Sequence, residues 1–529
     1  MRDAVAATQS RLGSRGGATE WWDRPWFLIA VVLLSAIPLI FPASPPLVDL
    51  PGHLGRYRVE LDLDSSADLQ RYFDFHWAMV GNLGVDLLII PLAPVLGLEN
   101  AVKLIVLAIP SLTAAGILLT AREVHGRVPP TALLAIPFIY NYPFHFGFLN
   151  YALAMALALL AFGFWLRLAR QGRFRFRAAL FVVISVAIWF AHMFGWVFLC
   201  VLCGSSELIR HRDAGRTWIR SIAGAATACA SLLLPAVLMI MWRSGATGGL
   251  TAYYGFVAKL VSLAAVLRDR WFLWDIFGVF VALTLVGVAV FDKRLTLSRV
   301  LALPAALLAV SYFVMPDLIF GSAYADTRLA PFALILAIAA IDFRRPVDFG
   351  VLHRVAVLAG LFMVLRIAGN TVSFGLAARE ADEQLQALDY VPRGAAVLSL
   401  VGAFCGEEWK MPRHLHFGSF VIVRKHGFSN DQYKLPGAAL LTIHYPAAGD
   451  FASDPSELVF GRKCLARSFP SADPTASRRR SADQALSEFP RQAFDYVWLV
   501  RPPDFEMTRR PGLTPAWRGR DSILYRVSH

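Results

Sequence analysis

Long apolar runs divide this chain into segments that suit a lipid bilayer better than water. A soluble protein carries about 25% charged residues, whereas this chain of 529 residues has 17% charged and 57% hydrophobic residues. The runs cover residues 26–42, 101–121, 130–142, 149–168, 178–191, 194–209, 222–242, 271–291, 300–316, 329–342 and 355–376. The pattern predicts an α-helical polytopic membrane protein with about eleven transmembrane helices.

The basic residues indicate which ends of these helices face the cytoplasm. With the N-terminus placed inside, the predicted inner segments carry 21 Lys and Arg residues and the predicted outer loops carry 9. Cytoplasmic loops are enriched in Lys and Arg in this way. The net charge of +13 therefore reflects membrane topology, and we exclude nucleic acid as a partner.

Three parts follow from this map. Residues 1–25 form a cytoplasmic leader, 26–376 a transmembrane domain whose first outer loop is 43–100, and 377–529 an exported domain. The apolar segment 84–97 contains two prolines and is short, so we expect a helix near the outer interface. In the exported part, strand-like runs at 395–401, 419–423, 439–444, 496–500 and 522–527 predict a soluble α/β domain.

The five cysteines separate by location. Cys200, Cys203 and Cys229 lie in predicted spans, where free cysteine usually serves as a small apolar packing residue. Cys405 and Cys464 lie in the exported domain, where an oxidising environment permits a disulfide. Whether these two cysteines pair is left open by the sequence.

The first outer loop contains the most specific polar motif, Val48-Asp49-Leu50-Pro51-Gly52-His53-Leu54-Gly55-Arg56-Tyr57. Asp49 before Pro51 suits the N-cap of a helix, and capping is one interpretation of its role. The other is a functional carboxylate, since His53 lies four residues later on the same helical face. Such a pair can activate a hydroxyl group or hold a divalent cation such as Mg²⁺ or Mn²⁺. Asp74 is a further candidate ligand.

Other polar side chains gather at the predicted outer ends of the spans. We interpret them as candidate substrate-binding residues, with helix-end hydrogen bonds, local ion pairs and membrane-interface anchoring as the structural alternatives. A metal site at His414 and His416 is a minor alternative. The candidate substrate-binding residues are Arg56, Tyr57, His145, Asn150, His192, Tyr324, Asp326, Arg328 and Arg366.

An acidic residue just after the first span, in a long first outer loop, resembles the GT-C superfamily of membrane glycosyltransferases. Residues 84–97, followed by Leu98-Glu99-Asn100-Ala101-Val102-Lys103, are similar to the loop helix and second span of those enzymes, and His125-Gly126-Arg127 resembles their short inner turn. The resemblance covers residues 25–210 by layout and weakens towards 376. It implies a polyprenyl-phosphate-linked sugar as donor and inversion at the anomeric carbon. The acceptor would belong to the cell envelope, at the outer face of a bacterial inner membrane.

The resemblance assigns Asp49 as general base and His53 as a residue that orients the acceptor or joins a metal site. Arg328 is the first choice for the donor phosphate, because a phosphate leaving group needs a cationic partner. Pro51-Gly52-His53 replaces the second carboxylate of the better-known pattern, so a requirement for metal stays open. The alternatives are a non-catalytic scaffold on the same core, a lipid or glycan transporter, and an O-antigen ligase or polymerase.

Overall fold

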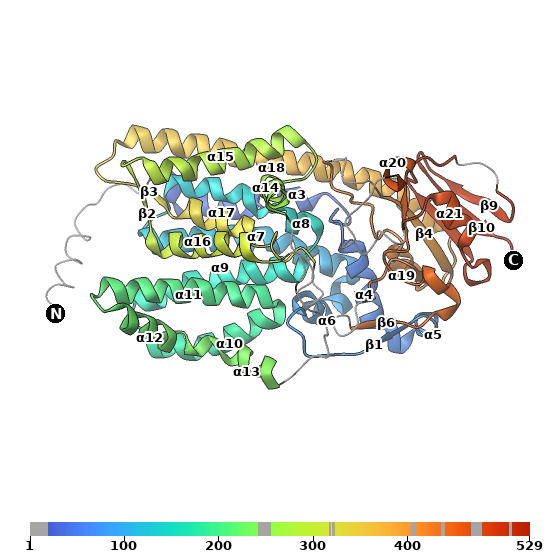
Figure 1. Ribbon diagram of the computed structural model, residues 1–529, viewed down its shortest axis with the longest axis horizontal. Coiled ribbons are helices and arrows are strands. Elements are labelled where there is room, and N and C mark those ends of the chain that lie inside the picture. Colours follow the sequence, from blue (N-terminus) through green and yellow to red (C-terminus); the bar gives the residue numbers. More distant parts are fainter. Residues whose placement is uncertain are drawn as a thin grey trace.

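A computed structural model describes residues 20–241, 255–316, 319, 323–403, 409–434, 440–466, 479–506 and 510–529. A bundle of long helices occupies one end of the molecule and a mixed sheet occupies the other (Figure 1). Helix α18, Phe349–Leu385, runs from the bundle to the sheet and joins the two parts with no intervening linker. The first nineteen residues of the predicted leader lie outside the described residues.

The bundle and the connections on its outer side contain most of the helices. They are α2 Pro25–Leu34, α3 Ile37–Ile40, α4 Leu50–Asp62, α5 Ala67–Gln70, α6 Gly84–Leu96, α7 Leu98–His125, the 3₁₀ helix η3 Pro130–Ile139, α8 Tyr142–Phe146, α9 Leu149–Arg170, α10 Phe174–Ala191, α11 Met193–Asp213, α12 Trp218–Ala228, α13 Leu234–Met241, α14 Phe256–Ala264, α15 Phe272–Phe291, α16 Arg299–Val314 and α17 Ala330–Ala339.

Six described helices, α7, α9, α10, α11, α15 and the long helix that begins at Phe349, are long and apolar enough to cross a bilayer. The pair Trp218–Ala228 and Ala230–Met241 is a seventh candidate, bent by 46° at its break. The remaining predicted spans are shorter or broken. Pro137 lies inside η3, and a proline cannot donate the backbone hydrogen bond that an α-helix requires. The first span is divided into α2 and α3 just before Pro38, where a proline disfavours helix in the preceding residue.

The connections between helices segregate to the two ends of the bundle as the charge pattern predicts. At one end, Arg127 contacts Glu20 at 3.3 Å and Asp342 at 2.7 Å, which joins two predicted inner segments to the last residue of the predicted span 329–342. Arg299 contacts Asp213 at 2.6 Å and joins two more. The described residues of the predicted outer loops lie at the other end, towards the sheet (Figure 1).

The sheet contains six strands in the order β5-β4-β8-β10-β9, with β7 also paired to β4. Strand β4 is parallel to β5, β7 and β8, whereas β10 is antiparallel to β8 and β9. The elements of this part are β4 Ala396–Ala403, α19 Ser419–Lys425, β5 Phe428–Ser429, β6 Leu441–Ile443, β7 Leu458–Phe460, α20 Arg462–Leu465, α21 Ala482–Glu488, β8 Tyr496–Val500, β9 Leu513–Arg518 and β10 Ser522–Val527.

The predicted strand at 419–423 is wrong, because these residues form helix α19. Strand propensity is weak and context-dependent, and here tertiary contacts favour a helix. The Asp431 carboxylate accepts hydrogen bonds from the Ser419 amide at 2.7 Å and from its hydroxyl at 2.9 Å. Val421 and Ile422 are fully buried. The helix thus receives both a terminal hydrogen-bond acceptor and an apolar interface.

The first outer loop packs directly against the C-terminal part. Strand β1, Phe73–Phe75, pairs antiparallel with β6, and α19 packs against α4. A side chain at Gly55 of α4 would place its Cβ 2.5 Å from the Gln432 amide nitrogen, so Gln432 would have to move from its present position. The Gln432 amide donates to the Gly52 carbonyl at 3.0 Å. Residues far apart in sequence therefore form one continuous interface.

The cysteines divide into free and bonded residues. Cys200, Cys203 and Cys229 are free thiols in the helical part. Cys464 is disulfide-bonded. Cys405, its predicted partner, lies outside the described residues.

Candidate functional site

Asp49 immediately precedes helix α4, with Pro51 in the first turn. Its backbone amide donates to the Phe146 carbonyl at 2.8 Å, and Gly147, at φ +101°, packs against it. An added Cβ at Gly147 would lie 3.0 Å from the Asp49 nitrogen, so this contact requires glycine. The Asp49 side chain makes no capping hydrogen bond to the helix. Its carboxylate is therefore free to face another element.

The element that Asp49 faces is the C-terminal part of the chain. One carboxylate oxygen, Oδ1, lies 3.7 Å from His416 Nε2. The Tyr433 hydroxyl lies 2.9 Å from the same ring nitrogen and also hydrogen-bonds to Asp49. His416 Nδ1 lies 3.0 Å from the Asp431 carbonyl. His416 has a φ of +59°, a left-handed backbone conformation that is uncommon in residues other than glycine.

Burial and nearby charges set the protonation of this group. Burial raises the pKa of Asp49 to about 6, partly offset by His416 and by the hydrogen bond from Tyr433. Burial likewise raises the pKa of Asp431 to about 6. Burial lowers the pKa of His416, but the carboxylates of Asp49, Asp454 and Asp431 outweigh it and raise the value above normal. The site is thus a buried carboxylate–imidazole arrangement, of the kind that exchanges protons with a substrate.

The other candidates on α4 take different positions. Burial lowers the pKa of His53 to about 3, so the ring is neutral, and it hydrogen-bonds to the backbone of Gly147. The Tyr57 ring stacks on His53 with 6.1 Å between centroids. Arg56 forms a 2.7 Å ion pair with Asp86. His53 thus stabilises the loop beside Asp49, and Arg56 joins α4 to α6.

Arg328 is the cation that the structure brings towards Asp49. The two groups interact electrostatically, and Arg328 is only 6% exposed. Its guanidinium carbon lies 4.4 Å above the centroid of the Phe148 ring. Tyr324 packs against Phe148 at 6.2 Å. A positive charge against aromatic rings, beside a buried carboxylate, suits an anionic ligand that also carries an apolar portion.

Several remaining candidates have structural partners instead. Asn150 donates to Asp86 at 3.1 Å. His192 caps α11 by accepting from the Phe194 amide at 3.1 Å. Asp326 pairs with Lys259 at 2.6 Å.

Two buried ion-pair networks lie at the end of the bundle that faces the sheet. Arg413 contacts Asp269, and its guanidinium lies 3.0 Å from His145 Nδ1. Arg366 contacts Asp275 at 3.3 Å. Arg413 joins the helical part to the segment that begins at residue 409, whereas the Arg366–Asp275 pair joins α18 to α15. Asp275 also accepts a hydrogen bond from Trp409 at 2.8 Å, so His145 and Arg366 both belong to the interface with this segment.

Among the described residues, the group that could hold a metal ion does not include Asp49, His53 or Asp74. Asp74 lies in β1, where it contacts His444 at 2.9 Å, and both side chains are substantially exposed. That group lies beside Asp49: ligand atoms of His416, Asp454 and Glu457 are all within 4.8 Å of one another. Sequence spacing indicated only His416 among these three. Asp454 and Glu457 lie in a loop with no local signal of metal binding.

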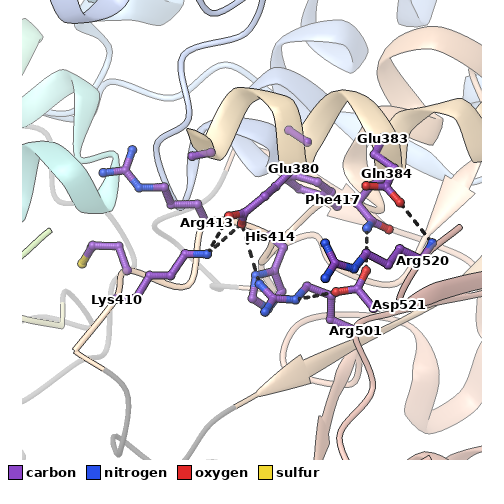
Figure 2. A pocket seen from close by; sticks show the side chains of 13 residues that line it. Glu380, Glu383, Gln384, Lys410, Arg413, His414, Phe417, Arg501, Arg520 and Asp521 are labelled. Atoms are coloured by element: carbon purple, nitrogen blue, oxygen red, sulfur yellow. Dashed lines mark hydrogen bonds and ion pairs between the residues drawn. The ribbon is translucent and has the colours of Figure 1, made fainter. Parts of the chain in front are cut away.

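A separate cavity of about 300 Å³ lies between α18 and the sheet. Figure 2 shows the charged side chains that point into it from both sides. Lys410 pairs with Glu380 at 2.7 Å, and Arg501 pairs with Asp521 at 3.1 Å. Because these charges neutralise one another within the wall, the cavity indicates no particular ligand.

No protein-family model matches this chain, and no curated protein is detectably similar to it.

Proposed function

We propose that this protein is an inverting glycosyltransferase of the GT-C type, with a polyprenyl-phosphate-linked sugar as donor. The observation that carries the proposal is Asp49. It is a 7% exposed carboxylate that does not cap its helix and that lies beside His416 and Tyr433, with an electrostatic interaction with Arg328, where the apolar bundle meets the C-terminal part. A lipid-linked substrate and a water-soluble acceptor would meet at such a boundary.

The proposed topology keeps eleven crossings. Six long helices and the bent pair supply seven of them. We propose that the α2–α3 pair, η3, α16 and α17 complete the set, with α6 lying at the outer interface. This arrangement would place the N-terminus in the cytoplasm and the sheet in the periplasm of a bacterium, with the protein in the inner membrane.

In the proposed reaction, the Asp49 carboxylate removes the proton from an acceptor hydroxyl as that oxygen attacks the anomeric carbon of the donor. The bond between the anomeric carbon and the phosphate oxygen breaks, and polyprenyl phosphate leaves with the bonding electrons. The new glycosidic bond has the inverted configuration. Arg328 would stabilise the negative charge that develops on the leaving phosphate. The acceptor would be an envelope glycan, lipid or protein.

The test uses purified full-length protein in detergent with a panel of synthetic polyprenyl-phosphate sugars and an envelope fraction as acceptor. Mass spectrometry measures the release of polyprenyl phosphate by wild type, by Asp49→Asn and by Asp64→Asn. Asp64 is an exposed carboxylate of the same loop and serves as the matched control. We expect wild type and Asp64→Asn to consume one donor, and Asp49→Asn to lose at least about 100-fold in rate.

Two results would contradict the proposal in different ways. Equal transfer by Asp49→Asn and wild type would remove Asp49 from the reaction. If no donor is consumed and none raises the unfolding temperature of wild type, the protein is not a transferase of this kind. A scaffold or transporter would then be the better description.

A further inference from the structure

We propose that His416, Asp454 and Glu457 form a binding site for a divalent transition-metal cation beside Asp49. All three residues belong to the C-terminal part of the chain, on the segments 409–434 and 440–466. Their ligand atoms lie within 4.8 Å of one another. The proposal is independent of the transfer reaction, because cation binding is measured directly.

Glu457 is the residue that most requires a cation. It is 0% exposed, and neither of its carboxylate oxygens has a described donor in good hydrogen-bond geometry, although Asp454 and its own backbone lie close. Its Oε1 atom lies 3.9 Å from His416 Nδ1. A buried carboxylate without donors is costly unless a proton or a metal ion compensates its charge. The burial of Glu457 therefore indicates a missing positive partner.

The charges around His416 lead to the same conclusion. The carboxylates of Asp49, Asp431 and Asp454 all act on its ring electrostatically, and Glu457 is a fourth. One protonated imidazole cannot balance four carboxylates. Arg328 interacts electrostatically with Asp49. For the other three carboxylates, Asp431, Asp454 and Glu457, His416 is the only basic partner among the described residues. A divalent cation would supply the balance at a single point.

The donor set favours a particular class of cation. An imidazole nitrogen with two carboxylates is a mixed N/O ligand set, which suits Mn²⁺ or Zn²⁺. Ca²⁺ and Mg²⁺ prefer ligand sets made only of oxygen atoms. The Asp431 carbonyl lies 3.0 Å from Nδ1, and the Tyr433 hydroxyl lies 2.9 Å from Nε2. Binding of a cation to the ring would therefore replace one of these two hydrogen bonds.

The competing explanation is a shared proton. Burial, and after it Asp454, raises the pKa of Glu457 well above normal, so a proton held between these two carboxyl groups would also satisfy the charge. The two explanations differ in one measurable quantity, the number of metal ions that the folded protein binds.

The test uses full-length protein in detergent, stripped with a chelator and titrated with Mn²⁺. Electron paramagnetic resonance measures free Mn²⁺, and elemental analysis measures the metal carried by the protein as purified. The variants are Glu457→Gln, His416→Gln and Asp454→Asn. His444→Gln is the matched control, because His444 also contacts an aspartate but lies on the exposed β1–β6 pair.

We expect one Mn²⁺ per chain in wild type and in His444→Gln, and at least about tenfold weaker binding in each of the three site variants. Folding of each variant is checked by its unfolding temperature. The proposal is overturned if folded wild type binds no Mn²⁺ or Zn²⁺, since a proton then occupies the site. It is also overturned if folded Asp454→Asn and Glu457→Gln bind as tightly as wild type. Loss of transfer activity with intact Mn²⁺ binding would contradict only the proposed function.

Discussion

Replacing Arg413 with methionine should destabilise the protein far more than replacing an exposed arginine. Arg413 contacts Asp269, the Pro46 carbonyl and His145, and so joins the C-terminal part to three segments of the helical part. Its side chain is 7% exposed and that of Asp269 is 2% exposed. Methionine keeps the apolar stem but leaves the Asp269 carboxylate buried without its cation.

The expected cost follows from that unpaired charge. Removing one partner of a buried ion pair typically costs about 3–5 kcal/mol, whereas an exposed pair contributes roughly 0–1 kcal/mol. Arg393 and Asp68 provide the exposed comparison, since their side chains are 62% and 33% exposed. We therefore expect Arg413→Met to cost about 3–5 kcal/mol and Arg393→Met to cost less than about 1 kcal/mol.

The assay is unfolding by SDS in mixed micelles, followed by tryptophan fluorescence, for both variants and for Arg413→Met combined with Asp269→Asn. The double variant should recover part of the loss, because asparagine removes the buried charge. Equal costs for Arg413→Met and Arg393→Met would refute the reasoning. So would a double variant less stable than Arg413→Met alone, because the cost would then come from lost packing.

Three further predictions concern the site and its surroundings. Gly147→Ala and Gly126→Ala should each lower the unfolding free energy by about 1 kcal/mol, because both residues have a positive φ. Only Gly147→Ala should also lower the rate of transfer, because only a Cβ at position 147 would meet Asp49. Burial raises the pKa of Glu60 to about 8. The neutral carboxyl therefore stabilises the fold at low pH, and this contribution is lost as the pH rises from the pKa of Glu60 in the unfolded chain towards 8. Glu60→Gln should therefore be close to wild type near pH 5 and exceed its unfolding free energy by roughly 4–5 kcal/mol at pH 9. A constant difference across pH would contradict this. Arg328→Ala should weaken donor binding about tenfold or more, with Arg328→Lys between it and wild type, measured by the thermal shift that the donor produces.

Local signals in the sequence were sufficient for much of the helical part. Apolar runs predicted the long helices, and the helix expected within 84–97 is confirmed as α6. The start of α4 at Asp49 and Pro51 was also predictable, because capping residues and first-turn prolines act within a few residues. Pro137 and Pro38 lie within two of the predicted spans, and prolines at these positions indicate irregular helices.

The surroundings of Asp49 were not predictable in the same way. Gln432 and Gly52 are 380 positions apart and form a hydrogen bond, and no periodicity in either segment indicates that contact. Whether Asp49 caps its helix or has another role depends on its contacts with Tyr433 and His416. These two residues are far from Asp49 in sequence, and only the tertiary structure places them beside it. The strand predicted at 419–423 failed for a related reason, since Asp431 and α4 supply interactions that outweigh its β-branched composition.

The pairing of β1 with β6 also has a consequence for biosynthesis. His444 hydrogen-bonds to the carbonyl of Gln70, 374 positions earlier. At about 5–20 residues per second, these two residues leave the ribosome roughly 20–75 s apart. During that interval β1 has an unpaired edge, and Asp49 lacks the residues that bury it. The nascent first loop is therefore a substrate for chaperones and proteases until the last quarter of the chain arrives, and a chain truncated before β6 would keep that vulnerability permanently.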